Sequence, residues 1–230
     1  MMALPPLTKL DWQQQFRVIP SVFPTIDFFE NMVPSHLMEA LWQLESLTND
    51  RLRDEVGNLS LVASQDRISG VGASVIMAAF THTSPARQSR FSNGSYGVYY
   101  AARLLETAIR ETVYHRGRFL GYTQEAPGEI AMRAYCGKIL QPLHDIRDES
   151  FSELYHPDNY QPSQYFGEKL RLQNAWGIVY HSVRHEGGEC IAVLRPPAIS
   201  IPKQSKHLSY VWNGEKITHV YEKSDVLFEF

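Results

Sequence analysis

The pattern of hydrophobic and polar positions predicts a chain with more strands than helices. Short runs of apolar and β-branched residues, some alternating with polar ones, are typical of strands in a partly buried sheet. The predicted strands are Phe16–Ile19, Val98–Tyr100, Ile130–Ile139, Gly177–Val183 and Cys190–Leu194. Closer to the C-terminus, Asn213-Gly214 separates the runs Leu208–Trp212 and Lys216–Glu222, which predicts a hairpin with a type I′ turn.

Apolar residues at helical spacing predict three helices. The first extends from Ser35, as its N-cap, to about Val56, and Gly57 ends it. Its apolar face consists of Leu37, Ala40, Leu41, Leu44 and Leu47. The second helix has its apolar side within Leu104–Val113, and the third covers Ser163–Leu172, again with the serine as N-cap.

The order of these elements indicates the fold class. No regular βαβ series appears, so we expect an α+β fold: one domain with a mixed or antiparallel sheet and flanking helices. Residues 1–15 are polar with two prolines and are expected to form an N-terminal arm, and residues 16–230 are expected to form the domain. Residues 141–162 have loop composition with some local structure.

Composition narrows the class of protein. The 230 residues include 22 Lys and Arg against 25 Asp and Glu, a net charge of −3, whereas proteins that bind nucleic acid by bulk electrostatics are usually basic. Cys136 and Cys190 have no metal or redox spacing, which is typical of reduced cytosolic thiols. No signal-peptide pattern is present, and the apolar run Val71–Phe80 is shorter than the roughly 20 residues of a membrane span. We expect a cytoplasmic protein without direct nucleic-acid or membrane contact.

Several familiar catalytic motifs are missing from the sequence. There is no G-x-x-x-x-G-K-[ST] loop and no G-x-S-x-G elbow, and Gly94 and Gly97 give only a weak G-x-x-G. His181 and His185 are four residues apart but span a predicted strand and turn, so they would not share a face and no metal site is expected. Ser182 and its neighbour His181 would point to opposite sides of the strand, which excludes them as nucleophile and base.

One stretch, residues 89–118, combines a glycine-punctuated loop, an aromatic strand and a helix. It carries Arg90, Tyr100 and Glu111, and a cation, an aromatic ring and a carboxylate together suit a cationic ligand that bears phosphate. Glu111 lies near the edge of the apolar helix face, where a glutamate is also commonly just solvated.

Two further candidates come from predicted strands. Ser182 and Arg184 would project to the same side of their strand, together with Tyr180, and a hydroxyl beside a guanidinium can bind an anion. Arg17 lies in the first predicted strand. The ordinary alternative for both strands is a polar face exposed to solvent.

Three separated motifs resemble one known family. They are FRVIPSVFPTIDFFE from Phe16, SRFSNGSYGVYYAARLLETAIRETVYHR from Ser89 and GIVYHSVRHEGGECIAVLRP from Gly177. In this order they resemble the RES-domain toxins, a family that takes its name from an arginine, a glutamate and a serine. The resemblance extends from about Arg17 to Pro196. The chain departs from the family pattern at Ser89–Asn93, where relatives have G-R-W-N, and at Val22, where some have a basic residue.

The resemblance implies a site assembled from distant segments. The positions that match the family pattern are Arg17, Arg90, Tyr100, Glu111 and Ser182. It implies that Arg17 and Arg90 grip the pyrophosphate of NAD⁺. Tyr100 would stack on the nicotinamide or bond the ribose, and Glu111 would stabilise the charge of the transition state. Ser182 would bind and orient the substrate, and Arg184 would meet a phosphate co-substrate.

The resemblance also implies an activity and a partner. It indicates a bacterial toxin of a type II toxin–antitoxin pair, with a fold similar to ADP-ribosyltransferases, that cleaves the nicotinamide–ribose bond as an NAD⁺ phosphorylase or glycohydrolase. NAD⁺ would be the substrate, with no cofactor and with inorganic phosphate as a candidate co-substrate. The expected partner is an Xre-like helix-turn-helix antitoxin, and the expected assembly is a homo-oligomer or a toxin–antitoxin hetero-oligomer. The alternatives are a protein ADP-ribosyltransferase toxin using the same NAD⁺ site and a non-catalytic binding domain.

Overall fold

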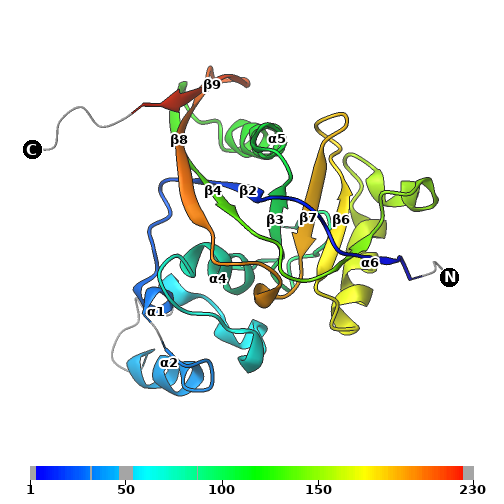
Figure 1. The fold of residues 1–230 in the computed structure, drawn as a ribbon. Coiled ribbons are helices and arrows are strands. Elements are labelled where there is room, and N and C mark those ends of the chain that lie inside the picture. Colours follow the sequence, from blue (N-terminus) through cyan, green and yellow to red (C-terminus); the bar gives the residue numbers. More distant parts are fainter. Residues whose placement is uncertain (1–3, 32, 47–53, 87, 225–230) are drawn as a thin grey trace, which may run out of the picture.

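A mixed β-sheet runs through the molecule. The computed structural model describes residues 4–31, 33–46, 54–86 and 88–224. Within these ranges nine strands pair in the order β1-β5-β6-β7-β3-β2-β4-β8-β9, and β5–β6 is the one parallel pair (Figure 1). The strands are β1 (Leu7–Thr8), β2 (Gln15–Pro20), β3 (Tyr99–Ala102), β4 (Gly128–Gly137), β5 (Leu143–Asp145), β6 (Gly177–His181), β7 (Glu189–Val193), β8 (Lys203–Trp212) and β9 (Ile217–Lys223).

Helices cover both faces of the sheet, and each face has its own apolar core. The α-helices are α1 (Asp27–Glu30), α2 (Met38–Ser46), α4 (Ser74–Thr81), α5 (Leu105–Thr123) and α6 (Gln161–Leu172). The 3-10 helices are η1 (Leu59–Leu61), η2 (Ser64–Asp66), η3 (Glu149–Tyr155) and η4 (Pro196–Ala198). Successive residues of β3 serve the two cores in turn, because Tyr100 and Ala102 pack on the α5 side while Tyr99 and Ala101 pack on the α4 side.

The sheet opens between β2 and β3. These strands pair at Phe16 and Ala102, whereas β2 pairs with β4 along its whole length. Beyond Phe16 the two strands separate, and Arg17 lies at this point. Its Nη1 atom donates to the carbonyl oxygen of Tyr100 at 2.9 Å, so a side chain joins the two halves of the sheet where the backbone ladder ends.

The predicted α+β fold with a mixed sheet is confirmed. Each of the five predicted strands is present, and the predicted hairpin forms from β8 and β9. Residues 141–162, predicted as a loop with local structure, contain β5 and η3. No helix among the described residues is long and apolar enough to cross a membrane.

The predicted type I′ turn is wrong. Four residues, 213–216, separate β8 from β9, and of these only Gly214 has a positive φ, at 94°. A type I′ turn needs two such residues. The side chain of Asn213 instead accepts hydrogen bonds from the backbone N–H groups of Glu215 and Lys216, at 2.9 and 2.8 Å, which stabilises a longer loop.

The first predicted helix differs in its start and in its buried side. α2 begins at Met38, so Ser35 is not its N-cap. Its inward side chains are Met38, Leu41 and Trp42. Leu37 and Leu44, predicted to be buried, are 50% and 66% exposed, because burying the larger Trp42 side removes more apolar surface from water. Residues 47–53 of the prediction, including Leu47, lie outside the described residues.

The predicted cap of α6 is also wrong. This helix begins at Gln161, and Pro162 occupies its first turn, where the missing N–H costs no hydrogen bond. Ser163 is buried within that turn, and its hydroxyl donates to the carbonyl oxygen of Tyr160 at 3.0 Å.

Candidate active site

Glu111 lies on α5 where the helix faces the turn after β6. Its Oε1 atom accepts a hydrogen bond from the Ser182 hydroxyl at 2.6 Å, and the Cys190 thiol approaches the same oxygen at 3.9 Å. Oε2 lies 3.9 Å from Nε2 of His115 and has no hydrogen bond within the described part of the chain. The carboxylate is therefore fixed through one oxygen and available through the other, and its side chain is 22% exposed.

Ser182 orients this carboxylate. β6 ends at His181, so the prediction that Ser182 and Arg184 share a strand face is wrong: both lie in the turn that follows. The Ser182 Oγ atom accepts the backbone N–H groups of Arg184 and His185, at 3.1 and 3.0 Å, and donates its proton to Glu111. One donor and two acceptor positions are all a hydroxyl offers, so each is occupied.

The turn that carries Ser182 is anchored on α5. Nδ1 of His185 and Oγ1 of Thr107 are 2.9 Å apart, one helical turn before Glu111. The backbone N–H of Ser182 donates to the carbonyl oxygen of Gly188 at 2.8 Å. A Cβ on Gly188 would lie 2.8 Å from the Thr107 side chain, so close packing of turn and helix requires glycine here.

Arg90 is 8% exposed and is held by backbone carbonyls. Its Nη1 atom donates to the carbonyl oxygens of Leu154 and His156, at 3.0 and 3.1 Å, and its guanidinium lies 4.7 Å from the ring centre of Tyr160. Arg90 therefore fastens the segment after η3 to the loop before β3.

Tyr100 is fixed by two hydrogen bonds. Its hydroxyl accepts the backbone N–H of Phe91 at 3.0 Å and donates to the Ser89 hydroxyl at 2.9 Å. Burial raises the pKa of Tyr100 to about 12, so the phenol is neutral at physiological pH.

Arg17 is not brought next to Glu111. Besides its bond to the Tyr100 carbonyl, its guanidinium stacks on the ring of Tyr99 at 4.5 Å, on the α4 side of the sheet. Its Nε atom is buried and has no hydrogen-bond partner among the described residues, and burial lowers the pKa of this arginine. Its described contacts therefore place its side chain on the α4 side of β3, whereas the Tyr100 side chain lies on the α5 side.

Arg184, in the same turn as Ser182, contacts both α5 and the segment after η3. Its guanidinium lies 3.4 Å from the ring centre of Tyr114, donates to the carbonyl oxygen of Pro157 and is 3.9 Å from the Asp158 carboxylate. The Tyr114 hydroxyl donates to the same carboxylate at 2.7 Å. These contacts join α5 to the segment after η3 and leave Arg184 only 14% exposed.

His115 is a member of the cluster that sequence reasoning missed. Burial and the positive charges of Arg184, Arg118 and Arg90 lower the pKa of His115, so the imidazole is neutral at pH 7. Its signal in the sequence was the spacing of four residues from Glu111, which places two helix side chains on one face.

Comparisons with known proteins show the family of this chain. The family model described as RES domain matches residues 65–213. A curated protein, the uncharacterized protein y4oC of Sinorhizobium fredii (strain NBRC 101917 / NGR234), is 32% identical over 214 residues, which cover 91% of this chain and 87% of that protein. The chain belongs to the RES domain family.

The matched segment of the RES domain contains Arg90, Tyr100, Glu111 and Ser182, whereas Arg17 lies before it. Among solved structures, the M. tuberculosis MbcT–MbcA toxin–antitoxin complex is similar with a TM-score of 0.39 and 11% identity. That match covers 55% of this chain and 72% of the other.

The residues around Glu111 in this RES domain can support only a few kinds of chemistry. A carboxylate with one free oxygen can stabilise a developing positive charge or hold a hydroxyl. The nearby guanidiniums can contact phosphate. No group of three or more His, Cys, Asp or Glu side chains in the described ranges is arranged to hold a metal ion.

Proposed function

We propose that this RES domain cleaves the bond between nicotinamide and ribose in NAD⁺. The observation that carries the proposal is the carboxylate of Glu111. Ser182 fixes it through Oε1, and Oε2 has no hydrogen bond to any described residue. Nicotinamide leaves NAD⁺ as a neutral molecule and takes the electron pair of the broken bond, so the reaction needs no general acid. Positive charge moves to the ribose ring instead, and a preorganised carboxylate lowers the energy of that state.

Each candidate then has a role in substrate binding or in catalysis. Glu111 faces the ribose carbon that becomes positive. Ser182 positions Glu111 rather than attacking, because its hydroxyl donates to the carboxylate that the transition state needs and accepts two backbone N–H groups. Tyr100 contributes its ring or hydroxyl to the nicotinamide riboside. Arg90 contributes positive charge for binding the substrate phosphates.

Arg17 and Arg184 have less direct roles. Arg17 holds the carbonyl of Tyr100, and its Nη1 must exchange that bond before it can grip the pyrophosphate of NAD⁺. Arg184 adds the cation that an incoming inorganic phosphate would require, with NAD⁺ as a substrate and no cofactor.

The products of the reaction identify the acceptor. Purified protein would be incubated with NAD⁺ with and without inorganic phosphate, and the products read by mass spectrometry. ADP-ribose-1″-phosphate that forms only with phosphate indicates phosphorolysis, and ADP-ribose indicates hydrolysis. Transfer of ADP-ribose to added protein supports the ADP-ribosyltransferase alternative, and unchanged NAD⁺ in every arm contradicts the proposal.

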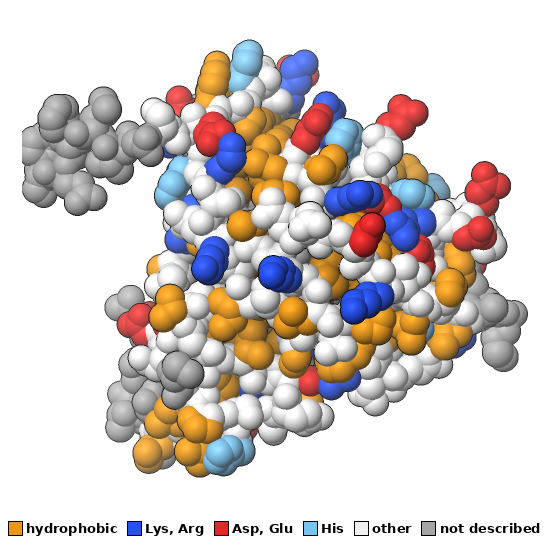
Figure 2. Space-filling view, in the orientation of Figure 1, with side chains coloured by type: hydrophobic (Ala, Val, Ile, Leu, Met, Phe, Trp, Pro, Cys, Tyr) orange, Lys and Arg blue, Asp and Glu red, His pale blue; other side chains and the backbone are white. Residues whose placement is uncertain are grey.

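We further propose that the protein is a toxin neutralised by an Xre-like helix-turn-helix antitoxin, through which any DNA contact would occur. Figure 2 shows acidic and basic side chains intermixed on the face in view, where a DNA-binding surface would have a basic patch. Expression alone should stop bacterial growth, and co-expression of a small helix-turn-helix protein from the neighbouring gene should restore it. Normal growth on expression of the active protein contradicts the toxin role.

A further inference from the structure

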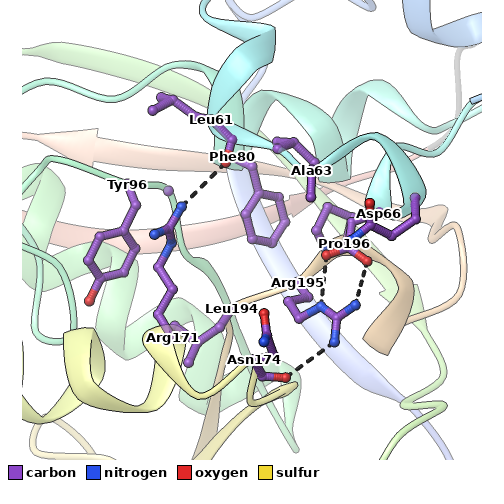
Figure 3. A pocket seen from close by; sticks show the side chains of 13 residues that line it. Leu61, Ala63, Asp66, Phe80, Tyr96, Arg171, Asn174, Leu194, Arg195 and Pro196 are labelled. Atoms are coloured by element: carbon purple, nitrogen blue, oxygen red, sulfur yellow. Dashed lines mark hydrogen bonds and ion pairs between the residues drawn. The ribbon is translucent and has the colours of Figure 1, made fainter. Parts of the chain in front are cut away.

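A partly enclosed cavity of about 140 Å³ lies beside the C-terminal end of α6, apart from the Glu111 cluster (Figure 3). Its walls have two chemical characters. Leu61, Phe80 and Leu194 form an apolar side, and Arg171, Asn174 and the Arg195–Asp66 pair form a polar side.

Arg195 is already neutralised. Its Nε and Nη2 atoms each donate to the Asp66 carboxylate at 2.7 Å, and its Nη1 donates to the carbonyl oxygen of Asn174 at 3.2 Å (Figure 3). Its guanidinium also lies 3.9 Å from the ring of Trp176. A bidentate pair of this geometry leaves little attraction for a second anion.

Arg171 is different, because no carboxylate among the described residues lies within ion-pair distance of it. Its guanidinium lies 4.9 Å from the ring centre of Tyr96, and Nη2 makes one long contact of 3.5 Å with the carbonyl oxygen of Leu61. Glu168, one turn earlier on α6, is exposed and forms no ion pair with Arg171. The cavity therefore carries one half-buried positive charge that has no ion-pair partner in the described part of the chain.

From this arrangement we infer that the cavity binds a small monoanion, a carboxylate on a compact apolar body. The carboxylate would pair with Arg171, and the body would lie against Leu61, Phe80 and Leu194. A cavity of about 150 Å³ is enough for a benzene-sized molecule. A dianion such as phosphate fits less well. Arg171 is the one cation of the cavity lining without an ion pair to the described residues, and the Asp66 carboxylate lies in the wall.

The cavity shares a wall with the loop that carries Arg90. The ring of Tyr96 lines the cavity, and its hydroxyl donates to the carbonyl oxygen of Phe91 at 2.5 Å, next to Arg90 in the chain. Neither Glu111 nor Ser182 lines the cavity, so binding there would not require these residues, and the inference does not depend on cleavage of NAD⁺.

Isothermal titration calorimetry on the intact protein tests the inference with three probes, which differ in whether they carry a negative charge, an apolar body or both. Benzoate has the charge and the apolar body, benzamide has the body alone, and inorganic phosphate has charge alone. Benzoate should bind with a Kd in the millimolar range or tighter, and benzamide and phosphate should bind at least about tenfold more weakly.

Two substitutions of Arg171 and one matched control locate the binding. Arg171→Gln should weaken benzoate at least about tenfold, and Arg171→Lys, which keeps the charge, should bind better than the glutamine variant. Arg116→Gln removes another partly buried arginine, on α5, and should leave the affinity unchanged. Equal benzoate binding by Arg171→Gln and the native protein, tighter binding of phosphate, or no binding of benzoate would each overturn the inference. Because Arg171→Lys retains the long side chain, it keeps the test valid if the glutamine variant does not fold.

Discussion

At the scale of single residues, the two oxygens of Glu111 have different partners, and this difference defines the site. Oε1 is held by Ser182, and Oε2 is free beside the neutral His115. The candidates Glu111 and Ser182 could be found in the sequence because the family motifs place them. Their hydrogen bond could not be found, since it joins residues 71 positions apart and depends on where β6 ends.

Replacing Ser182 tests the positioning role. In Ser182→Ala, Glu111 loses its fixed orientation and two backbone N–H groups lose their acceptor. We expect kcat for NAD⁺ cleavage to fall about tenfold or more with little change in KM, and unfolding free energy to fall by about 1–3 kcal/mol. Steady-state kinetics and urea unfolding measure both quantities. A native kcat in the variant would mean that Glu111 does not need Ser182.

Arg90 is expected to affect stability as well as substrate binding. Its guanidinium is buried and satisfies the carbonyl oxygens of Leu154 and His156. Arg90→Ala should therefore lower the unfolding free energy by about 3 kcal/mol, in addition to raising KM for NAD⁺. The control is Arg110→Ala, which removes an exposed arginine of α5. Comparing the unfolding free energies of the two variants in urea separates the loss of the carbonyl contacts from a general effect of lost charge. Equal stability of the two variants would show that the carbonyl contacts contribute little.

At the scale of elements, the turn between β6 and β7 rests on α5 through His185 and Thr107. Thr107→Val keeps the shape of the side chain and removes its hydrogen bond to His185. Thr107 is fully buried, so the loss should loosen the turn and lower kcat several-fold while KM stays within about twofold. Thr123→Val, at the exposed end of the same helix, is the control. Equal kcat values for the two variants would contradict a positioning role for this contact.

The predicted strands were right where periodicity was unambiguous, and the predicted buried side of α2 was wrong because two apolar stripes competed. The five strands follow from their β-branched and aromatic runs. On α2, by contrast, one apolar stripe contains Leu37 and Leu44 and another contains Met38 and Trp42, and only tertiary packing decides between them. Hydrophobic spacing alone does not record which side meets a core.

At the scale of the whole molecule, buried tyrosines make the fold sensitive to alkali. Burial raises the pKa of Tyr99 and of Tyr210 from the ordinary value of 10.0 to about 12. The neutral phenol is thus favoured by folding, so this stability is fully present below pH 10 and is lost as the pH rises from 10 through about 12. Thermal unfolding between pH 8 and 12, with tyrosinate absorbance followed in parallel, should show the melting temperature falling above pH 10 as these phenols ionise. A flat melting temperature to pH 12 would contradict their burial.

The position of Arg17 illustrates what topology decides. Sequence resemblance groups it with Glu111 and Ser182, yet β2 and β3 separate just after Phe16, and Arg17 enters the gap on the Tyr99 side of the sheet. Strand order and the place where a ladder ends are products of the entire chain. The fold class was thus accessible from the sequence, while the contacts between the matched positions were not.

The rate of NAD⁺ loss in a Glu111 variant tests the central claim most directly. Purified native protein, Glu111→Gln and Glu153→Gln, an exposed control on η3, would be compared at equal concentration with NAD⁺ and phosphate, after circular dichroism has shown all three folded. The glutamine at position 111 removes the negative charge but keeps the shape, so NAD⁺ loss should fall at least about 100-fold, with the control at the native rate. Native activity in Glu111→Gln would contradict the assignment of this carboxylate as the catalytic group.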